Sequence, residues 1–199
     1  MRTVKTPHGP ARVELRIADG ARAALVLGHG AGGGTGAPDL HAATRAALSA
    51  GVSVALVEQP YRVAGRRSPA PAGQLDTAWL AVIAALRAKE LKGHALVTGG
   101  RSSGARVACR TAAEAEAVAV LCLAFPVHPP GKPEKTRLDE LDGVKLPVLV
   151  VQGERDPFGM PPPKRGRRKV VTVAGDHGLK ASLPDVEAAV ARWLPTVIG

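Results

Sequence analysis

The chain has 199 residues, of which 45% are hydrophobic and only 3% aromatic, and its formal net charge is +10. Its length and apolar content exclude intrinsic disorder and predict one folded domain, residues 1–199, with a core of Ala, Val and Leu side chains. No apolar stretch reaches the roughly 20 residues that a membrane-spanning helix needs. The N-terminal segment lacks the apolar centre of a secretory signal, so we expect a cytoplasmic protein.

Cysteines and clustered charges point to few ligands. Cys109 and Cys122 are the only cysteines, and two free thiols do not make a zinc site, so we expect neither a metal nor an organic cofactor. The one basic run, “KRGRRK” at Lys164–Lys169, is interpreted as a solvated loop, with an anion-contacting patch as the alternative. No RNA-binding aromatic pattern accompanies it, so we do not expect a nucleic-acid partner.

Strand-like and helix-like segments alternate along the chain. The predicted strands are Arg12–Ile17, Ala23–Leu27, Ser53–Glu58, His94–Thr98, Ala117–Leu123, Val148–Gln152 and Val170–Val173. The predicted helices are Asp39–Ala50, Gly73–Lys89, Ser103–Ala113 and Leu183–Leu194. Most strands are continuous Val, Leu and Ala runs, typical of strands covered on both faces. The pattern predicts an α/β fold of three layers, with a mostly parallel sheet of about seven strands between helices.

The connections between these elements add two expectations. Only “ADGAR”, Ala18–Arg22, joins the first two predicted strands, which is too short for a crossover helix. We therefore expect these two strands to be antiparallel neighbours. Exposed loops are predicted over Tyr61–Gly73, Phe125–Pro133 and around Pro161–Pro163 because these segments are rich in Pro, Gly or Arg.

A glycine-rich loop follows the strand Ala23–Leu27. Its sequence “GHGAGG”, Gly28–Gly33, matches the G-x-G-x-x-G of dinucleotide-binding proteins, and Glu58 could be the ribose-binding acid. In that fingerprint the last glycine opens a helix, whose N-terminus meets the pyrophosphate. Here the earliest helix start is Pro38, well beyond the motif. This delay argues against a dinucleotide site.

A second motif, “GGRSSG” at Gly99–Gly104, places Ser102 in a G-x-S-x-G sequence between a predicted strand and a predicted helix. This is the setting of a nucleophile elbow, where small neighbours let the strand and the helix pass closely. Asp156 and His177 each follow the end of a later predicted strand. The order Ser, Asp, His is that of α/β-hydrolases and predicts a nucleophile, an orienting acid and a general base.

Other residues compete for these roles or complete them. His128 in “FPVHPP” is an alternative base, but His177 follows the last strand, where that base is expected. Asp176 adjoins His177, and its side chain points elsewhere, so Asp156 is the better orienter. The glycine-rich loop is interpreted as an oxyanion hole, with the backbone N–H groups of Ala31 and Ser103 as donors. We name as candidate pocket-wall residues His29, Gly32, Arg101, Phe125 and His128, with a structural role favoured for His29.

These motifs resemble the α/β-hydrolase superfamily, and within it a small branch typified by testis-expressed protein 30 and dienelactone-hydrolase-like proteins. The resemblance rests on His29–Gly33, Gly99–Gly104 and Phe125–Pro130 and covers nearly the whole chain. Ser103 departs from it, because the branch commonly has Met after the nucleophile. The resemblance implies the hydrolase fold. The roughly 20 residues between Phe125 and Leu146 leave no room for a cap domain, so we expect an open, shallow site.

Taken together, the motifs predict a serine hydrolase that cleaves a small-molecule carboxylic ester or thioester through an acyl-enzyme. The alternative is a non-catalytic interaction module with the same fold. An intact set of Ser102, Asp156 and His177 favours the enzyme, because a scaffold has no physical need for all three.

Overall fold

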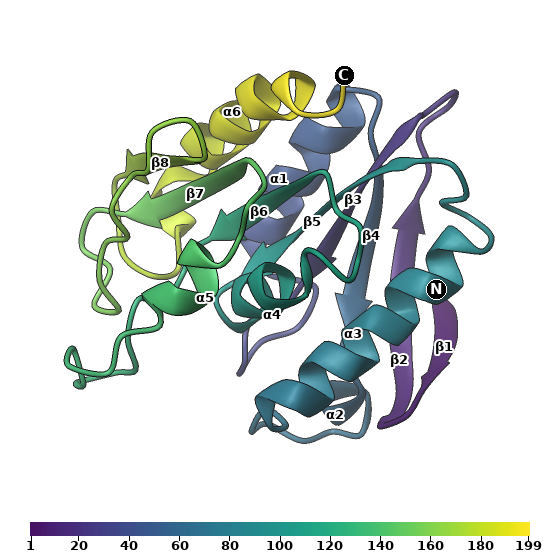
Figure 1. Ribbon diagram of the computed structural model, residues 1–199, viewed down its shortest axis with the longest axis horizontal. Helices are drawn as coiled ribbons and strands as arrows, with labels where there is room; N and C mark the ends of the chain where they lie inside the picture. The colour runs from purple at the N-terminus through teal and green to yellow at the C-terminus, as the bar shows by residue number, and fades with distance from the viewer.

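One mixed sheet of eight strands runs through the molecule in the order β1-β2-β4-β3-β5-β6-β7-β8, as the computed structural model of residues 1–199 describes it (Figure 1). The strands are β1 (Arg2–Thr6), β2 (Gly9–Arg16), β3 (Ala23–Gly28), β4 (Ser53–Glu58), β5 (Ala95–Arg101), β6 (Ala119–Leu123), β7 (Val148–Gly153) and β8 (Arg168–Val173). The helices are α1 (Pro38–Ser49), α2 (Pro60–Val63), α3 (Ala72–Arg87), α4 (Ser103–Thr111), α5 (Leu138–Asp142) and α6 (Leu183–Trp193). The predicted α/β architecture is confirmed.

The N-terminal edge of the sheet differs from the prediction. Strand β1 was not predicted, and it forms an antiparallel hairpin with β2. The expectation that β2 and β3 are neighbours is wrong, because β2 pairs antiparallel with β4, with Arg12 opposite Glu58. Every residue of β3 is buried, and such a strand is most stable in the middle of the sheet, between β4 and β5. The half-exposed β2 takes a place nearer the edge.

Helices cover both faces of the sheet and bury its apolar side chains. Figure 1 shows α1 and α6 behind the sheet and α3, α4 and α5 in front of it. Leu40 of α1 and Trp193 of α6 belong to one core cluster with the residues on the rear face of the strands. Trp79 of α3 is fully buried against the N-terminal half of the front face. The helices thereby fix the carboxyl ends of β3, β5, β7 and β8 along one edge.

Two of the segments predicted as loops are more ordered than expected. Tyr61 lies in α2 and is buried, so the segment from Tyr61 to Gly73 is only partly an exposed loop. Phe125 is also fully buried, directly after β6. The only regular element between β6 and β7 is α5, so no separate cap stands over the carboxyl edge of the sheet. None of the helices combines the length and the apolar character that crossing a bilayer requires.

The basic run Lys164–Lys169 is a loop only in part, because its last two residues belong to a strand and one of them is buried. Strand β8 begins at Arg168, whose side chain is only 5% exposed and lies 3.1 Å from the Asp142 carboxylate. Pairing with β7 draws this residue into the sheet, because Arg168 lies opposite Val148. Lys169 lies in β8 with its side chain exposed, and Lys164 to Arg167 are exposed as predicted.

We expect Asp142→Asn to lower the free energy of unfolding by about 1–2 kcal/mol, because it leaves the buried Arg168 guanidinium without a counter-charge. Urea denaturation measures this loss. As a matched control, Lys164→Gln removes an exposed charge 3.9 Å from the same carboxylate, and should change stability by less than about 0.5 kcal/mol. Equal effects from both substitutions would contradict the role given to Arg168.

Candidate active site

Ser102 stands at the turn from β5 to α4 in a strained backbone conformation. Its φ is 52° and its ψ is −109°, a region that residues with a side chain rarely adopt. The turn is possible because glycines let three chain segments meet. A Cβ atom on Gly104 would lie 2.3 Å from the carbonyl oxygen of Gly28, and one on Gly100 would lie 2.5 Å from the same oxygen. The tight turn presents the Ser102 hydroxyl at the carboxyl edge of the sheet.

The three residues predicted as a triad lie in hydrogen-bond contact. The Ser102 Oγ atom is 2.9 Å from His177 Nε2, and His177 Nδ1 is 2.8 Å from Asp156 Oδ2. The Asp156 side chain is 1% exposed and that of His177 is 17% exposed, so the acid is buried behind the imidazole. A hydroxyl, an imidazole and a carboxylate in this order can transfer a proton from the hydroxyl to the imidazole.

Asp156 is held from a second side by Gln152, a residue that sequence reasoning missed. The Gln152 side chain is fully buried at the end of β7. Its Nε2 atom donates to Asp156 Oδ2 at 2.8 Å, to the Gly159 carbonyl at 2.9 Å and to the Phe125 carbonyl at 3.1 Å. The Phe158 N–H donates to the other carboxylate oxygen, Oδ1, at 2.9 Å. In the sequence, Gln152 is visible only as a polar residue that follows the apolar run Val148–Val151. Only the fold shows which groups it contacts.

His128, the alternative candidate for the base, lies outside the hydrogen-bonded set of Ser102, His177 and Asp156. The His128 Nδ1 atom lies 2.9 Å from the Pro129 carbonyl, and the ring packs beside Gly159, without a hydrogen bond to Ser102 or Asp156. The ring that packs on His177 is that of Phe158, with ring centroids 4.3 Å apart. Phe158 was not predicted and forms part of the wall beside the imidazole.

Two side chains hold the glycine-rich loop. His29 is buried, and its ring accepts the Gln59 N–H at Nε2, 3.1 Å away. Its Nδ1 atom must then carry the proton, which it donates to the Gly30 carbonyl at 2.8 Å. Burial lowers the pKa of His29 from its usual value, so the ring stays neutral. The Tyr61 hydroxyl donates to the Ala31 carbonyl at 2.8 Å.

The N–H groups predicted as oxyanion donors have no acceptor within the protein. The N–H of Ala31 forms no hydrogen bond, while the neighbouring Gly33 N–H is used in a turn to Gly30. Ser103 is the first residue of α4, and N–H groups in the first turn of a helix lack intrahelical acceptors. The loop passes close to Ser102, since a Cβ atom on Gly30 would lie 3.6 Å from the Cβ atom of Ser102. N–H groups without an acceptor suit the binding of a developing negative charge.

Comparison with known protein families decides which family this arrangement belongs to. The family model described as alpha/beta hydrolase domain matches residues 21–183. The chain belongs to the alpha/beta hydrolase family. Among curated proteins, none matches this alpha/beta hydrolase. Its narrower resemblance to the branch typified by testis-expressed protein 30 stays a prediction.

Solved structures of other alpha/beta hydrolases share the fold over almost the whole chain. XC6422 from Xanthomonas campestris, an a/b serine hydrolase without a lid, is 24% identical over 98% of this chain and 94% of its own, with a TM-score of 0.75. Est1E from Butyrivibrio proteoclasticus, solved with ferulic acid, is 18% identical over 100% and 99%, with a TM-score of 0.78. A dienelactone hydrolase from Anabaena variabilis is 18% identical over 100% and 97%, with a TM-score of 0.77.

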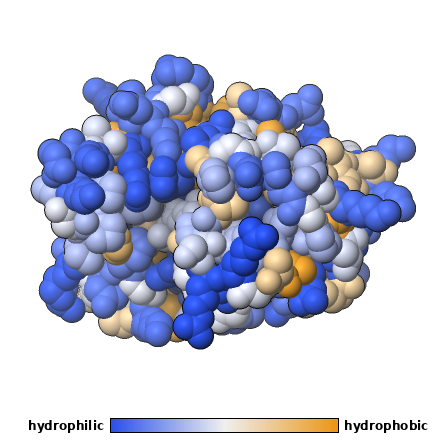
Figure 2. Space-filling view, turned by 90° about the horizontal axis from the view of Figure 1, so that it is seen from below, coloured by the Kyte–Doolittle hydropathy of each residue, from blue (hydrophilic) through white to orange (hydrophobic).

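The surface of this alpha/beta hydrolase shows no deep pocket at Ser102. None of its five main cavities is lined by Ser102, Asp156 or His177. Figure 2 shows one face on which polar side chains predominate and hydrophobic ones form only small, separate groups. Of the candidate wall residues, Phe125 is fully buried, whereas Gly32 is exposed. No three His, Cys, Asp or Glu side chains are arranged to hold a metal ion.

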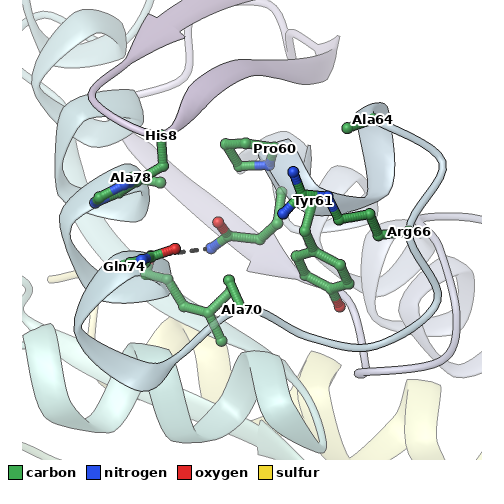
Figure 3. Close-up of a pocket in the computed structure, with 10 residues that line it drawn as sticks. His8, Pro60, Tyr61, Ala64, Arg66, Ala70, Gln74 and Ala78 are labelled. Carbon is green, nitrogen blue, oxygen red and sulfur yellow. Dashed lines mark hydrogen bonds between the residues drawn. The ribbon is translucent and has the colours of Figure 1, made fainter.

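One small cavity lies beside Tyr61, which holds the glycine-rich loop, rather than at the Ser102 hydroxyl. Gln59, Tyr61, Arg66 and Gln74 are among its lining residues, and Figure 3 shows the Tyr61 ring at its side. Its volume of about 50 Å³ is far below the several hundred Å³ of typical ligand pockets. The cavity therefore has room for ordered water but not for a substrate.

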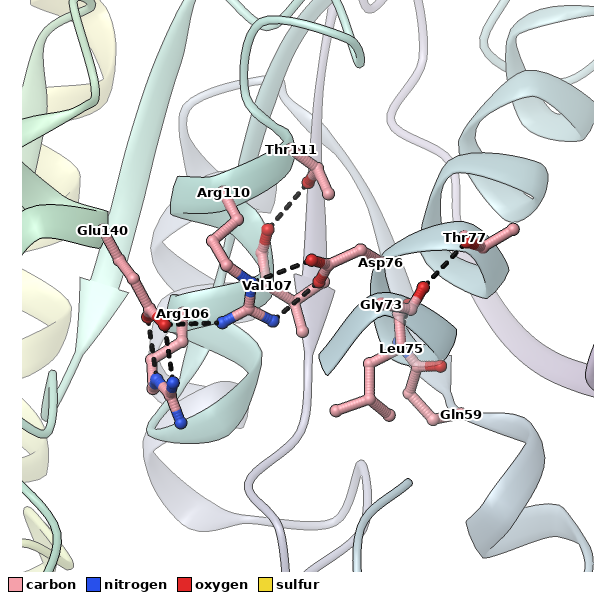
Figure 4. A network of polar contacts seen from close by, with 10 residues as sticks. All are labelled: Gln59, Gly73, Leu75, Asp76, Thr77, Arg106, Val107, Arg110, Thr111 and Glu140. Atoms are coloured by element: carbon pink, nitrogen blue, oxygen red, sulfur yellow. Dashed lines mark hydrogen bonds and ion pairs between the residues drawn. The ribbon is translucent and has the colours of Figure 1, made fainter. Parts of the chain in front are cut away.

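An ion-pair network fixes the helix that begins at the elbow. Arg110 of α4 forms a two-pronged contact with Asp76 of α3, at 2.6 and 2.8 Å (Figure 4). Arg106, one turn earlier, does the same with Glu140 of α5, at 2.6 and 2.8 Å. Arg110 also reaches Glu140 at 3.2 Å. Bidentate arginine–carboxylate contacts fix the orientation of the two groups as well as their distance. They therefore hold α4 against α3 on one side and against α5 on the other.

We expect Gln152→Met to lower ester hydrolysis at least about tenfold, because Asp156 loses the donor that fixes its carboxylate. Steady-state kinetics should show the loss in kcat. Thr98→Val is the matched control, since the Thr98 hydroxyl is buried in the same sheet without a partner. A Gln152→Met protein with wild-type kcat would show that the amide has no part in orienting Asp156.

We expect Tyr61→Phe to lower kcat about three- to tenfold without changing KM, because one hydrogen bond to the Ala31 carbonyl is lost and the loop gains freedom. Thr44→Val removes a buried hydroxyl bonded within α1 and should leave kcat unchanged. If Tyr61→Phe raises KM alone, Tyr61 contacts the substrate instead of holding the loop.

Proposed function

We propose that this alpha/beta hydrolase is a serine hydrolase that cleaves carboxylic ester or thioester bonds through an acyl-enzyme. The observation that carries the proposal is the continuous contact from Ser102 Oγ through His177 to the buried Asp156. The strained φ of Ser102 adds to it, because strain of roughly 1–3 kcal/mol persists only where the surrounding structure enforces it. A non-catalytic interaction module would have no use for that combination.

In the first step, His177 Nε2 accepts the proton of the Ser102 hydroxyl as Oγ attacks the substrate carbonyl carbon. Asp156 accepts the Nδ1–H of His177, which keeps Nε2 free as the base and stabilises the imidazolium that forms. The N–H groups of Ala31 and Ser103 donate to the carbonyl oxygen as it becomes negative. The imidazolium then protonates the departing alcohol or thiol, and the acyl group stays on Ser102.

In the second step, water completes the reaction. His177 takes a proton from a water molecule, whose oxygen attacks the acyl carbon of the ester on Ser102. The same two N–H groups stabilise the second tetrahedral intermediate. When that intermediate collapses, the imidazolium returns a proton to Ser102 Oγ and the carboxylic acid leaves. Every step uses groups of this chain and water, so the cycle needs no cofactor.

The open surface around Ser102 supports small or flexible acyl substrates. With no cap and no deep cavity at the hydroxyl, few contacts are available to enclose a long chain. The similar structures include a dienelactone hydrolase and Est1E, which was solved with ferulic acid. Both names agree with carboxylic ester chemistry on this fold.

Hydrolysis of p-nitrophenyl esters of increasing acyl length, with one matched thioester, tests the proposal. We expect the highest kcat/KM with short acyl chains and a steady fall as the chain lengthens, because an open site gains little from added methylenes. A fluorophosphonate probe should inactivate the protein. Absence of hydrolysis with every ester, together with no reaction with the probe, would favour the interaction module.

A further inference from the structure

Arg101 precedes Ser102, and its guanidinium contacts three segments whose relative positions matter for the proposed reaction. Its Nη2 donates to the main-chain carbonyl of His177 at 3.0 Å. Its Nη1 packs against the glycine-rich loop, where a Cβ atom on Gly30 would lie only 2.9 Å from it. Its Nε lies 2.9 Å from Asp39 Oδ2, at the start of α1. The side chain is 21% exposed, so it stands largely behind the site.

Asp39 is an unusual partner, because its side chain is completely buried. Burial raises its pKa, while the Arg101 charge acts in the opposite direction. A buried ion pair contributes little to stability compared with apolar side chains, but separating its two charges is costly, so each partner restricts the position of the other. Asp39 Oδ1 also accepts the Leu40 N–H at 3.0 Å, so the carboxylate is fixed to the helix. The guanidinium is therefore anchored in one orientation.

We infer that Arg101, locked in place by the buried Asp39, is a positioning residue that sets the spacing between His177, Ser102 and the oxyanion loop. The inference rests on the proposed function and extends it to residues without a chemical role in the two steps. One planar guanidinium donates to the His177 carbonyl, pairs with the Asp39 carboxylate and fills the space that a side chain at Gly30 would need. A lysine has a single nitrogen at the end of its side chain and cannot reproduce these contacts.

The decisive variant is the double substitution Arg101→Met with Asp39→Asn. Removing Arg101 alone would leave Asp39 buried and unpaired, which destabilises the fold for reasons unrelated to positioning. The double variant removes both charges and keeps the side-chain volumes. We expect its thermal midpoint to stay within a few degrees of wild type, while kcat falls at least about tenfold and KM is unchanged.

Two further variants separate positioning from stability. Asp39→Asn alone keeps the Arg101 donors but loosens their anchor, so kcat should fall less than in the double variant. Arg45→Met with Glu187→Gln removes another arginine–carboxylate pair, 2.8 Å apart, that joins α1 to α6 and has no contact with the triad residues. It should leave kcat unchanged. If the double variant is not folded, Arg101→Lys decides the question, because it keeps a positive charge for Asp39 but not the planar set of donors. Wild-type kcat in that variant would overturn the inference.

The outcomes distinguish this inference from the proposed function. A wild-type protein that hydrolyses esters, with a folded double variant of equal kcat, would overturn the positioning role alone. A kcat loss that only follows the folded fraction would overturn it as well. A wild-type protein that neither hydrolyses esters nor reacts with the fluorophosphonate probe would overturn the proposed function and this inference with it.

Discussion

Ser102→Ala should reduce ester hydrolysis by about a thousandfold or more, because the covalent step loses its nucleophile and only the oxyanion donors remain. The fold should be unaffected, since the Ser102 hydroxyl forms a hydrogen bond only with His177 and alanine occupies less space. Kinetics with p-nitrophenyl acetate measure the loss, and thermal unfolding monitored by circular dichroism confirms the folded state.

The two histidines provide the matched pair for this prediction. His177→Gln should lose nearly as much activity as Ser102→Ala, because the effects of substituting residues that act together in catalysis are not additive. His128→Gln should lose much less, because His128 forms no hydrogen bond to Ser102 or Asp156. If His128→Gln were the more severe change, the base would be misassigned.

Gly104→Ala should lower the free energy of unfolding by about 3 kcal/mol, a thermal midpoint lower by roughly 10 °C, because the new methyl group has no space. A Cβ atom there would lie 2.3 Å from the carbonyl oxygen and 2.5 Å from the carbonyl carbon of Gly28. Backbone atoms cannot rotate away as a side chain can, so β3 and α4 must separate. Activity should fall too, because Gly28 leads directly into the glycine-rich loop, whose Ala31 N–H is proposed as an oxyanion donor.

Gly73→Ala is the control for this loss. Gly73 lies in α3, and a Cβ atom there would meet nothing within 4 Å. Alanine in a helix is favoured over glycine by about 0.5–1 kcal/mol, so this variant should be as stable as wild type or more stable. Similar losses in both variants would mean that the contact between β3 and α4 is not tight.

The sequence alone was enough to predict most of the sheet and the residues now proposed as a triad. Ser102, Asp156 and His177 follow strands whose apolar runs are strong local signals, and parallel strands bring their carboxyl ends to one edge. Strand β1 was not predicted because its five residues, “RTVKT”, include only one apolar side chain. The partner of β2 could not be predicted from a short link, because pairing depends on which strand needs full burial.

Contacts between distant segments were beyond sequence reasoning. Gln152 donates to the Phe125 carbonyl, Tyr61 donates to the Ala31 carbonyl, and Asp39 pairs with Arg101. Each of these contacts joins residues that are far apart in the sequence. Arg168 was expected to be exposed because it belongs to a basic run. It is buried, because β8 pairs with β7 at this position. The sequence shows that polar residues lie beside apolar segments, but only the fold shows which groups these polar residues contact.

The most direct test of the account is to locate the adduct after wild-type protein reacts with a fluorophosphonate probe. Trypsin cleaves after Arg101 and Arg106 and releases Ser102–Arg106, “SSGAR”. Fragmentation of this peptide in a mass spectrometer separates its two serines. We expect one equivalent of probe, attached to the first serine, Ser102. An adduct on Ser103 or on another peptide, or no adduct on active protein, would contradict the assignment of Ser102 as the nucleophile.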